Sequence, residues 1–363
     1  LVALALPGCG DSHDHEKAEA GHSEHHHEAP HGGTLVELGK HEFNLEFVVD
    51  AGAGKLTAYV LDAHASKFLR IPMPAIEVIA KIGDQSHSLA LKPVASFAEW
   101  AAQAEAYVCT ARREFSAECV VLPEYCTASL MSIPVNGRPG TAHDAAAYAP
   151  RYVELFKGLA MREKLAVLAG TQLVAEGNKL YNTAHLFHPD GRIDTQRKLH
   201  LTPTETRAWG INPGDALKLV ELPFGKAALL TCDDIEFPEL ARQARSRGAQ
   251  VLFCPSCTDD RHGFPRVRYT AQARAIENQV YVILSMTVGS LPIDDLRAHQ
   301  GQAAILTPCD YPFPTAGVLA QGELNQDMVV AADLDMEAIT RAQSGGSVRT
   351  WQDRRKDLYP LAE

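Results

Sequence analysis

The sequence contains no run approaching the roughly 20 apolar residues that a membrane-spanning helix requires, so no segment is predicted to cross a bilayer. It also lacks any stripe of Lys and Arg interleaved with aromatic residues. Its 45 acidic residues outnumber 34 basic ones and give a formal charge of −11. These features argue against nucleic acid as a partner. No pattern repeats with a period of about 20 to 50 residues, which excludes a solenoid.

The 8 cysteines show no spacing typical of a disulfide framework, so cross-links are not expected to define the fold. Hydrophobic residues make up 46% of the chain and charged residues 22%, which is typical of a globular protein with an apolar core. At 363 residues, the chain is long enough for one large domain and a smaller module.

The chain opens with LVALALPGCGDSHDHE and begins with Leu, which is typical of the end of a longer signal segment. Within this opening, Leu6-Pro7-Gly8-Cys9 resembles the lipobox of bacterial lipoproteins, with Pro7 as an untypical occupant. The resemblance implies a lipid anchor at Cys9 and a membrane-anchored extracytoplasmic protein, with residues 1–9 as a signal remnant. The alternative is an incidental cysteine in a cytoplasmic protein, whose reducing compartment suits a free thiol.

Residues 10–33 are rich in histidine and acidic residues and show no apolar periodicity, so we expect a disordered tether. Imidazole and carboxylate groups together favour Zn, Cu or Ni, but no fixed ligand spacing selects among these metals. A solvated linker without metal is the alternative. The predicted weak metal ligands are His22, His25, His26, His27 and His31.

Residues 34–95 alternate apolar and polar side chains, as half-buried strands do. The segment DAGAGK between two such runs predicts a hairpin loop, and Gly83-Asp84 predicts a second one. We therefore predict a small all-β domain of about five strands. HGGTLVELGKHEFNLEFV and GKLTAYVLDAHA resemble the compact domain of His-rich exported lipoproteins.

Residues 96–363 alternate between helical periodicity and short apolar strands. Helices are predicted for FAEWAAQAEAYVCTARRE and RYVELFKGLAMRE, and strands for CVVLP and LAVLAGTQLV. LYNTAHLFHPDGRIDTQRKLHL predicts a hairpin that turns at Asp190-Gly191. This pattern predicts an α/β domain that runs to the C-terminus.

Cys232 lies between a strand and a helix in ALLTCDDIEFPELARQA, where Pro238 is a favourable first helical residue. Such a turn exposes a side chain at the rim of a sheet, where a helix dipole and backbone amides favour a thiolate. A cysteine that only packs in the core is the alternative.

A thiolate that cleaves an amide also needs a group that transfers protons and a positive donor for the oxyanion. In CVVLPEY, Pro123 ends a strand and places Glu124 at the same rim as Cys232. In RKLHLTPTE, Lys198 ends the hairpin strand and supplies a point charge. Either residue alone is commonly a solvated surface charge. The hypothesis therefore depends on the combination of Glu124 and Lys198 with Cys232.

VVLPEY, RKLHLTPTE and LLTCDDIEFPELAR, in that order, resemble the three motifs of the nitrilase, or carbon–nitrogen hydrolase, superfamily. The resemblance extends over about residues 97–359. It implies a four-layer αββα sandwich that forms a homodimer or a higher homo-oligomer. It further implies that Cys232 is the nucleophile, Glu124 the general acid and base, Lys198 the stabiliser of the tetrahedral intermediate and Glu205 the group that holds the lysine. It also implies that catalysis requires no metal or other cofactor.

The resemblance also implies that the Asp233 backbone N–H joins Lys198 in the oxyanion site. True nitrilases usually carry Trp-Glu after the nucleophile, whereas this chain carries Asp233-Asp234, which favours amides or carbamoyl amides over nitriles. The predicted pocket walls are Tyr125, Tyr181 and the loop from Thr258 to His262.

Two other features have alternative interpretations. Arg261, Arg266 and Arg268 would suit an amide that bears a carboxylate, or they form structural ion pairs. CPSC at residues 254–257 follows a strand instead of opening a helix, so we predict incidental placement near the pocket over a redox or zinc motif.

One expected element is missing from the sequence pattern. The family's domain normally begins with a strand before its first helix, and no segment with the usual sequence of that strand precedes residue 96. Either SHSLALKPVAS substitutes for this strand or the domain is incomplete at that edge, with unpaired backbone groups.

The leading functional hypothesis is a hydrolase that cleaves a non-peptide C–N bond in a linear amide through a Cys-Glu-Lys triad and a thioester. Its partner would be a small amide. The alternative is an exported metal-binding lipoprotein with an inactive hydrolase domain. A third possibility is that two coding sequences were joined near residue 95.

Overall fold

The computed structural model describes residues 2–5, 29–30, 32–39, 42–52, 55–65, 76–82, 85–91, 96–133, 135, 140–258, 262–289, 291 and 298–358. Its contacts divide the chain into two units, one made of Leu1–Cys9 with Ala95–Glu363 and the other of Gly10–Val94. The predicted lipobox cysteine, Cys9, and the five predicted metal-binding histidines lie outside the described residues.

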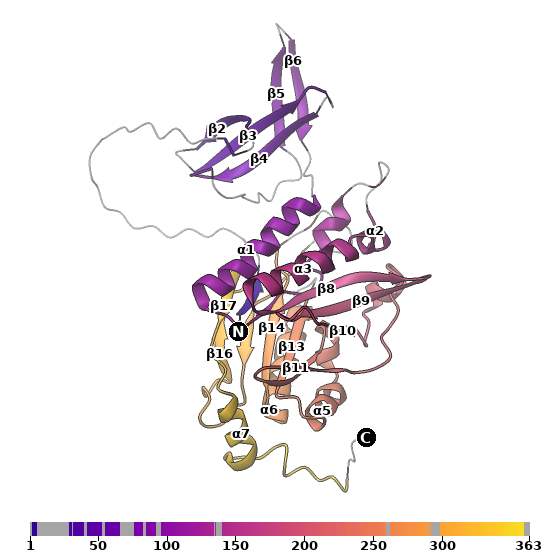
Figure 1. The fold of residues 1–363 in the computed structure, drawn as a ribbon, viewed down its shortest axis with the longest axis vertical. Helices are drawn as coiled ribbons and strands as arrows, with labels where there is room; N and C mark the ends of the chain where they lie inside the picture. Colours follow the sequence, from indigo (N-terminus) through magenta and orange to yellow (C-terminus); the bar gives the residue numbers. More distant parts are fainter. Residues whose placement is uncertain are drawn as a thin grey trace, which may run out of the picture. The chain divides into compact units, whose positions relative to one another are not determined.

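The larger unit alternates strands with helices along the chain (Figure 1). Its strands are β1 (Val2–Ala5), β7 (Cys119–Val121), β8 (Ala166–Glu176), β9 (Lys179–Phe187), β10 (Ile193–Arg197), β11 (Leu219–Leu222), β12 (Gly225–Leu229), β13 (Val251–Ser256), β14 (Tyr281–Met286), β15 (Ala304–Leu306), β16 (Val318–Gln321) and β17 (Met328–Ala331). Its helices are α1 (Phe97–Phe115), α2 (Ala142–Ala146), α3 (Ala149–Glu163), α4 (Pro203–Arg207), α5 (Pro238–Ser246), α6 (Gly263–Asn278) and α7 (Met336–Gly345), with 3-10 helices η1 (Ala128–Ser132) and η2 (Cys232–Glu236).

The strands of this unit form two six-stranded sheets, ordered β10-β9-β8-β7-β1-β17 and β11-β12-β13-β14-β15-β16. A buried cluster joins the facing sides of the sheets, with Val121 from the first and Phe253 from the second. Their neighbours Val120 and Leu252 point the opposite way, because successive side chains of a strand alternate between its faces. Val120 packs with α1 and α3, and Leu252 packs with α5 and α6. The predicted αββα sandwich is therefore confirmed.

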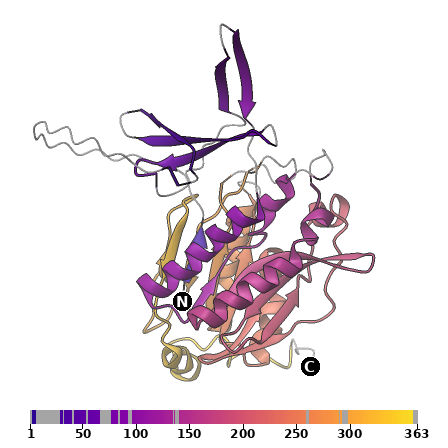
Figure 2. The ribbon, with the colours of Figure 1, turned by 45° about the horizontal axis from the view of Figure 1, so that its top comes forward.

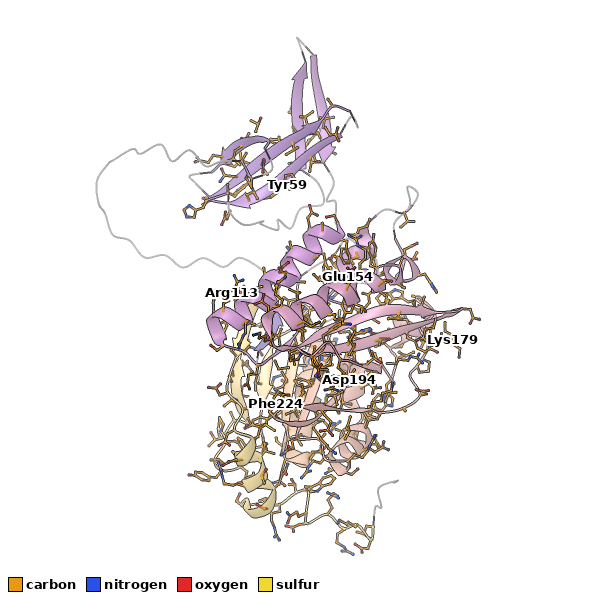
Figure 3. All side chains as sticks on the ribbon, viewed as in Figure 1. Tyr59, Arg113, Glu154, Lys179, Asp194 and Phe224 are labelled. Carbon is orange, nitrogen blue, oxygen red and sulfur yellow. The ribbon has the colours of Figure 1, made fainter. Side chains whose placement is uncertain are left out.

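The outer helix layer over the first sheet consists mainly of α1 and α3, which run side by side (Figure 2). Trp100 and Val108 of α1 and Tyr152 and Phe156 of α3 are buried at helical spacing, so each helix turns one apolar face to the sheet. Glu154 lies on the exposed side of α3 (Figure 3). No helix within the described ranges is long and apolar enough to cross a membrane.

β1 lies between β7 and β17 in the first sheet. It pairs in parallel with β7, with Val2 opposite Val120, and antiparallel with β17, with Ala5 opposite Met328. In this position it provides partners for backbone N–H and C=O groups of both neighbouring strands. The opening residues of the chain therefore supply the strand that the sequence pattern lacked before α1.

The smaller unit contains, in its described parts, β2 (Thr34–Leu38), β3 (Phe43–Asp50), β4 (Lys55–Asp62), β5 (Ile76–Ile82) and β6 (Gln85–Leu91). The first three form an antiparallel sheet and the last two a separate hairpin. Asp50 pairs with Lys55 and Ile82 with Gln85, so both hairpins turn where the sequence predicted. Because β6 pairs with β5, SHSLAL does not replace the first strand of the larger unit. Both predicted alternatives, a substitute strand and an incomplete edge, are wrong.

Candidate active site

Three strand ends bring Glu124, Lys198 and Cys232 together. Glu124 follows β7, Lys198 follows β10 directly, and Cys232 follows β12 in the other sheet. Lys198 Nζ lies 2.9 Å from Glu124 Oε1, and the backbone of Cys257 joins the other two residues: its N–H donates to Glu124 Oε2 at 2.9 Å and its carbonyl oxygen lies 3.6 Å from Cys232 Sγ. All three side chains are buried. The structure therefore places the three predicted residues in one cluster between the ends of the two sheets.

Lys198 forms buried ion pairs with two carboxylates. Its Nζ lies 2.9 Å from Glu124 Oε1 and 2.9 Å from Glu205 Oε2, so Glu205 contacts the lysine as the sequence predicted. Burial disfavours the ammonium, but the two carboxylates outweigh it and hold the pKa of Lys198 well above its usual value. Lys198 is therefore a fixed positive charge in a site that excludes bulk water.

The two carboxylate oxygens of Glu124 have different partners. Oε1 accepts hydrogen bonds from Lys198 Nζ at 2.9 Å and from Asn182 Nδ2 at 2.8 Å. Oε2 accepts one from the backbone N–H of Cys257 at 2.9 Å. Burial raises the pKa of Glu124 to about 7; Lys198 opposes this shift and the nearby Glu205 charge adds to it. A carboxyl group with a pKa near neutrality suits a group that both accepts and donates protons.

Glu205 is held at the start of α4 by a reciprocal capping box. Its Oε2 accepts from the Thr202 backbone N–H at 2.8 Å, and its own N–H donates to Thr202 Oγ1 at 3.3 Å. The Tyr125 hydroxyl donates to Glu205 Oε1 at 2.6 Å. Burial opposes ionisation, but Lys198, Tyr125 and Thr202 outweigh it and lower the pKa of Glu205. Glu205 therefore remains a carboxylate near neutral pH.

Cys232 occupies a strained turn. Its φ is +49°, a left-handed conformation that residues other than glycine rarely adopt. Its Sγ lies 3.6 Å from the carbonyl oxygen of Cys257. Burial raises the pKa of the thiol well above its usual value, with Glu124 adding to the shift and Lys198 opposing it. The expectation that the turn itself favours a thiolate is therefore wrong, and the resting thiol must pass its proton to a base.

Asp234 links the segment after Lys198 to the turn that carries Cys232. Its buried carboxylate accepts from the backbone N–H groups of Leu199 at 3.2 Å and His200 at 2.8 Å. His200 Nδ1 lies 2.9 Å from the same carboxylate. The second acidic residue of Asp233-Asp234 therefore fixes the backbone of the lysine segment relative to the nucleophile.

Two of the predicted pocket residues lie beside the triad. Tyr125, which follows Glu124 directly, has a φ of +51° and bonds to Glu205 through its hydroxyl. Asp233 follows Cys232 and is half-buried, and burial raises the pKa of its carboxyl while Lys198 opposes the shift. The role of the Asp233 backbone N–H in an oxyanion site stays a prediction.

The other predicted pocket residues point elsewhere or lie at the edge of the described chain. Tyr181 is on the opposite face of β9 from Asn182, and the Arg197 guanidinium lies 3.9 Å from its ring centroid. The Thr258 hydroxyl donates to the Gln300 carbonyl at 2.5 Å, and His262 is exposed at the start of α6. Residues 259–261 lie outside the described chain.

Sequence reasoning missed three contributors to the site. Asn182 donates to Glu124, and Thr171 Oγ1 accepts from the Tyr125 backbone N–H at 3.0 Å. The Cys257 N–H donates to Glu124 and its carbonyl contacts the Cys232 thiol, so CPSC borders the site, as predicted, and contributes through its main chain. Of these three contributors, only Asn182 had a usable signal in the sequence. It is a polar residue in the otherwise apolar start of LYNTAHLF, one strand away from Lys198.

The arginines near the site make local contacts. Arg266 Nε lies 3.3 Å from Glu236 Oε2, and Arg268 bonds to the side-chain oxygens of Gln272 and Gln321. These contacts favour the structural alternative for the two arginines, while Arg261 lies outside the described residues. Over the described ranges, no group of three or more His, Cys, Asp or Glu is arranged to hold a metal ion.

The geometry of the site agrees with the family of the chain. Residues 85–343 match the Carbon-nitrogen hydrolase family. The match covers more than half of the chain, so the chain belongs to this family. It begins at residue 85, and the comparisons give no support to the lipoprotein resemblance of the preceding segment.

Individual relatives point the same way. Probable hydrolase YhcX of Bacillus subtilis (strain 168) is 41% identical over 75% of this chain, and the chain spans about half of it, 53%. Omega-amidase NIT2 of Xenopus tropicalis is 30% identical over 60% of this chain and 80% of that protein. A carbon-nitrogen hydrolase from Helicobacter pylori G27 has the same fold, with a TM-score of 0.61, 20% identity and coverage of 74% of this chain and 94% of that one. Saccharomyces cerevisiae Nit3 aligns with a TM-score of 0.57 and 23% identity over 73% of this chain and 90% of that one.

Proposed function

We propose that this protein hydrolyses the C–N bond of a linear amide, with Cys232 as nucleophile, Glu124 as general base and acid, and Lys198 as electrostatic stabiliser. One observation carries the proposal: the buried Glu124 carboxylate contacts the Lys198 ammonium at 2.9 Å and is joined to the Cys232 thiol through the backbone of Cys257. The similarity to omega-amidase NIT2 of Xenopus tropicalis supports an amide as the substrate class.

The first half-reaction forms a thioester. Glu124 takes the Cys232 proton as the sulfur attacks the carbonyl carbon, and the developing oxyanion is stabilised by Lys198 and the Asp233 backbone N–H. Glu124 then delivers this proton to the nitrogen as the C–N bond breaks. Ammonia or an amine leaves, and the acyl group stays on Cys232 Sγ.

The second half-reaction uses water. Glu124, again ionised, takes a proton from a water molecule that attacks the thioester carbonyl, and the same Lys198 charge stabilises the second oxyanion. The thiolate leaves and recovers a proton from Glu124, which releases the carboxylic acid. A group that is alternately base and acid works best with a pKa near the working pH, which the value of about 7 for Glu124 provides.

Amides are favoured over nitriles because Asp233-Asp234 follows the nucleophile where true nitrilases of the family carry Trp-Glu. A metal-free mechanism, a homo-oligomer and a lipid anchor at Cys9 stay predictions. The inactive-domain alternative depended on a missing first strand, and β1 fills that position. We therefore propose no second function.

The test is ammonia release from a panel of primary amides, ω-amides of dicarboxylic acids, carbamoyl amines and nitriles. Wild-type protein is compared with Cys232→Ala and with Cys119→Ala, a matched variant at a fully buried cysteine in the core between the sheets. We expect activity on an amide in wild type and Cys119→Ala, and none above background in Cys232→Ala. Equal activity in wild type and folded Cys232→Ala would rule out the thiol mechanism.

A further inference from the structure

Asn182 is a polar residue in the buried strand β9, with 1% of its surface exposed. Its side-chain nitrogen donates to Glu124 Oε1 at 2.8 Å and to Glu205 Oε1 at 3.0 Å. A side-chain amide has two N–H donors, so both are committed to the two carboxylates of the site. Asn182 therefore bridges the same pair of glutamates that Lys198 bridges.

The strand pairing fixes Asn182 beside Lys198. The backbone carbonyl of Asn182 accepts from the Lys198 N–H at 2.9 Å, and Lys198 Nζ donates to the same oxygens, Glu124 Oε1 at 2.9 Å and Glu205 Oε1 at 3.0 Å. One neutral amide and one ammonium thus hold the carboxylates from adjacent positions. A backbone hydrogen bond sets the positions of Asn182 and Lys198 relative to each other, so these positions do not depend on flexible loops.

The carbonyl of the Asn182 side chain supports the same assignment. Among the atoms that the structure describes, Asn182 Oδ1 is buried and has no hydrogen-bond partner. Rotating the amide by half a turn would set this oxygen against two carboxylates, which repel it, so the carboxylates decide the orientation. A buried carbonyl without a partner opposes folding. The two donor contacts to the carboxylates, and not a contact of the carbonyl, fix the orientation of the Asn182 amide.

Because Lys198 and Asn182 bind Oε1 of Glu124, only its other oxygen, Oε2, is left for other contacts. Oε2 accepts from the N–H of Cys257, and the carbonyl of Cys257 lies 3.6 Å from Cys232 Sγ. The backbone of Cys257 thus links Oε2, and not Oε1, to the nucleophile. We propose that Asn182 is a positioning residue that, together with Lys198, holds Oε1 and leaves Oε2 to exchange the proton of Cys232. This inference rests on the proposed role of Glu124 as the base.

Loss of the Asn182 amide would change the position of Glu124 Oε1 and the pKa of the Glu124 carboxyl group. Donors to a carboxylate favour its ionised form, so Asn182 opposes the burial that raises the pKa of Glu124 to about 7. Without these donors the pKa of Glu124 rises further. The proton of Cys232 is then accepted only at higher pH.

The test uses Asn182→Leu, which removes both donors at similar size, and Asn182→Ser, which keeps one hydroxyl donor. The rate of Cys232 alkylation by iodoacetamide is followed across pH by mass spectrometry of the peptide that contains Cys232. For Asn182→Leu we expect the midpoint of this profile to rise by about one pH unit, the change for losing a bond to a charged group. Asn182→Ser should fall between it and wild type. With an amide that wild type cleaves, kcat should fall about tenfold or more while KM changes little.

Asn278→Leu is the matched control. Asn278 is buried, donates to the Arg274 carbonyl at 3.0 Å and to Glu277 Oε1 at 3.4 Å, and likewise has an Oδ1 without a partner. It lies at the end of α6 and reports the general effect of losing a buried amide. We expect it to lower thermal stability without moving the alkylation midpoint.

The proposal is overturned if both Asn182 variants keep the wild-type midpoint and lose rate only in proportion to their folded fraction, as the Asn278 control does. Failure of the proposed function has a different signature, namely amide hydrolysis that persists in Cys232→Ala. The alkylation profile does not require turnover, so it tests Asn182 independently of substrate choice.

Discussion

The end of β7 and the start of α4 each present a buried glutamate to the same ammonium, yet their pKa values shift in opposite directions. Glu124 is 1% exposed and Glu205 is 3% exposed, so burial does not distinguish them. Glu205 accepts from a phenol hydroxyl and a capping N–H that Glu124 lacks. Its pKa is lowered, whereas that of Glu124 is raised to about 7.

The opposite pKa shifts show how two glutamates in one ion-pair cluster can have different roles. Glu205, which accepts from four donors, stays ionised and fixes Lys198, while burial and, to a smaller extent, the charge of Glu205 raise the pKa of Glu124 to about 7. The comparison supports the proposed roles, proton transfer for Glu124 and positioning for Glu205. Three experiments test these proposed roles.

The largest effect is expected from exchanging each glutamate for its isosteric amide. Glu124→Gln removes the proton-transfer group, so kcat/KM should fall by about 10²- to 10⁴-fold. Glu205→Gln keeps Lys198 paired with Glu124 and should cost less than about 10²-fold. Steady-state kinetics on one amide measures both. Equal losses of kcat/KM, or a larger loss for Glu205→Gln, would contradict the proposed roles of the two glutamates.

The next effect is a shift of the pH profile. Glu124 must be ionised to take the Cys232 proton, so kcat/KM should rise with pH through about 7 and fall below it, where Glu124 is protonated. Because the charge of Glu205 raises the pKa of Glu124, Glu205→Gln should move this acidic limb to lower pH, opposite to the shift expected for Asn182→Leu. An unmoved or upward-shifted limb in Glu205→Gln would contradict the electrostatic account.

The smallest effect is expected at Tyr125. Tyr125→Phe removes one donor that Glu205 receives, so the pKa of Glu205 should rise while Lys198 and Thr202 still hold it. Stability should drop by about 1 to 2 kcal/mol, measured by urea unfolding, and kcat should fall less than about tenfold. A loss above about 10²-fold would instead indicate that the phenol contacts the reacting group.

The catalytic candidates were predictable because their positions are local. Glu124 and Cys232 each follow a short apolar strand, Lys198 follows the second strand of a predicted hairpin, and ends of neighbouring strands meet at the same edge of a fold. The hairpin turn at Asp190-Gly191 was predictable for the same reason. The pKa of Cys232 was not, because it depends on burial and on Glu124, neither of which a turn motif specifies.

Contacts between strands far apart in the sequence escaped prediction. The Cys257 backbone reaches Glu124 from the other sheet, and Tyr181 faces away because it is one residue from Asn182 on the same strand. A one-residue change in alternation moves a side chain to the opposite face, and register is set by pairing partners. Sequence order alone therefore could not decide which polar residues share the site.

β1 shows the same limit at the level of the fold. The family match begins at residue 85, in the strand that precedes α1 along the chain, whereas the first sheet takes Val2–Ala5 between β7 and β17. A short apolar run is equally compatible with a buried strand and with a signal segment.

From periodicity and strand-end positions, which are local properties of the chain, the sequence predicted an α/β domain, the two small hairpins and Cys232, Glu124 and Lys198 as candidates. The αββα layers and Glu205 were implied by the resemblance of the motifs to the family. The strand that completes the first sheet, the opposite pKa shifts of the two glutamates and the position of Asn182 beside them appear only in the folded chain. Those outcomes depend on burial and on hydrogen-bond donors brought from distant segments, and both exist only after the sheets have packed.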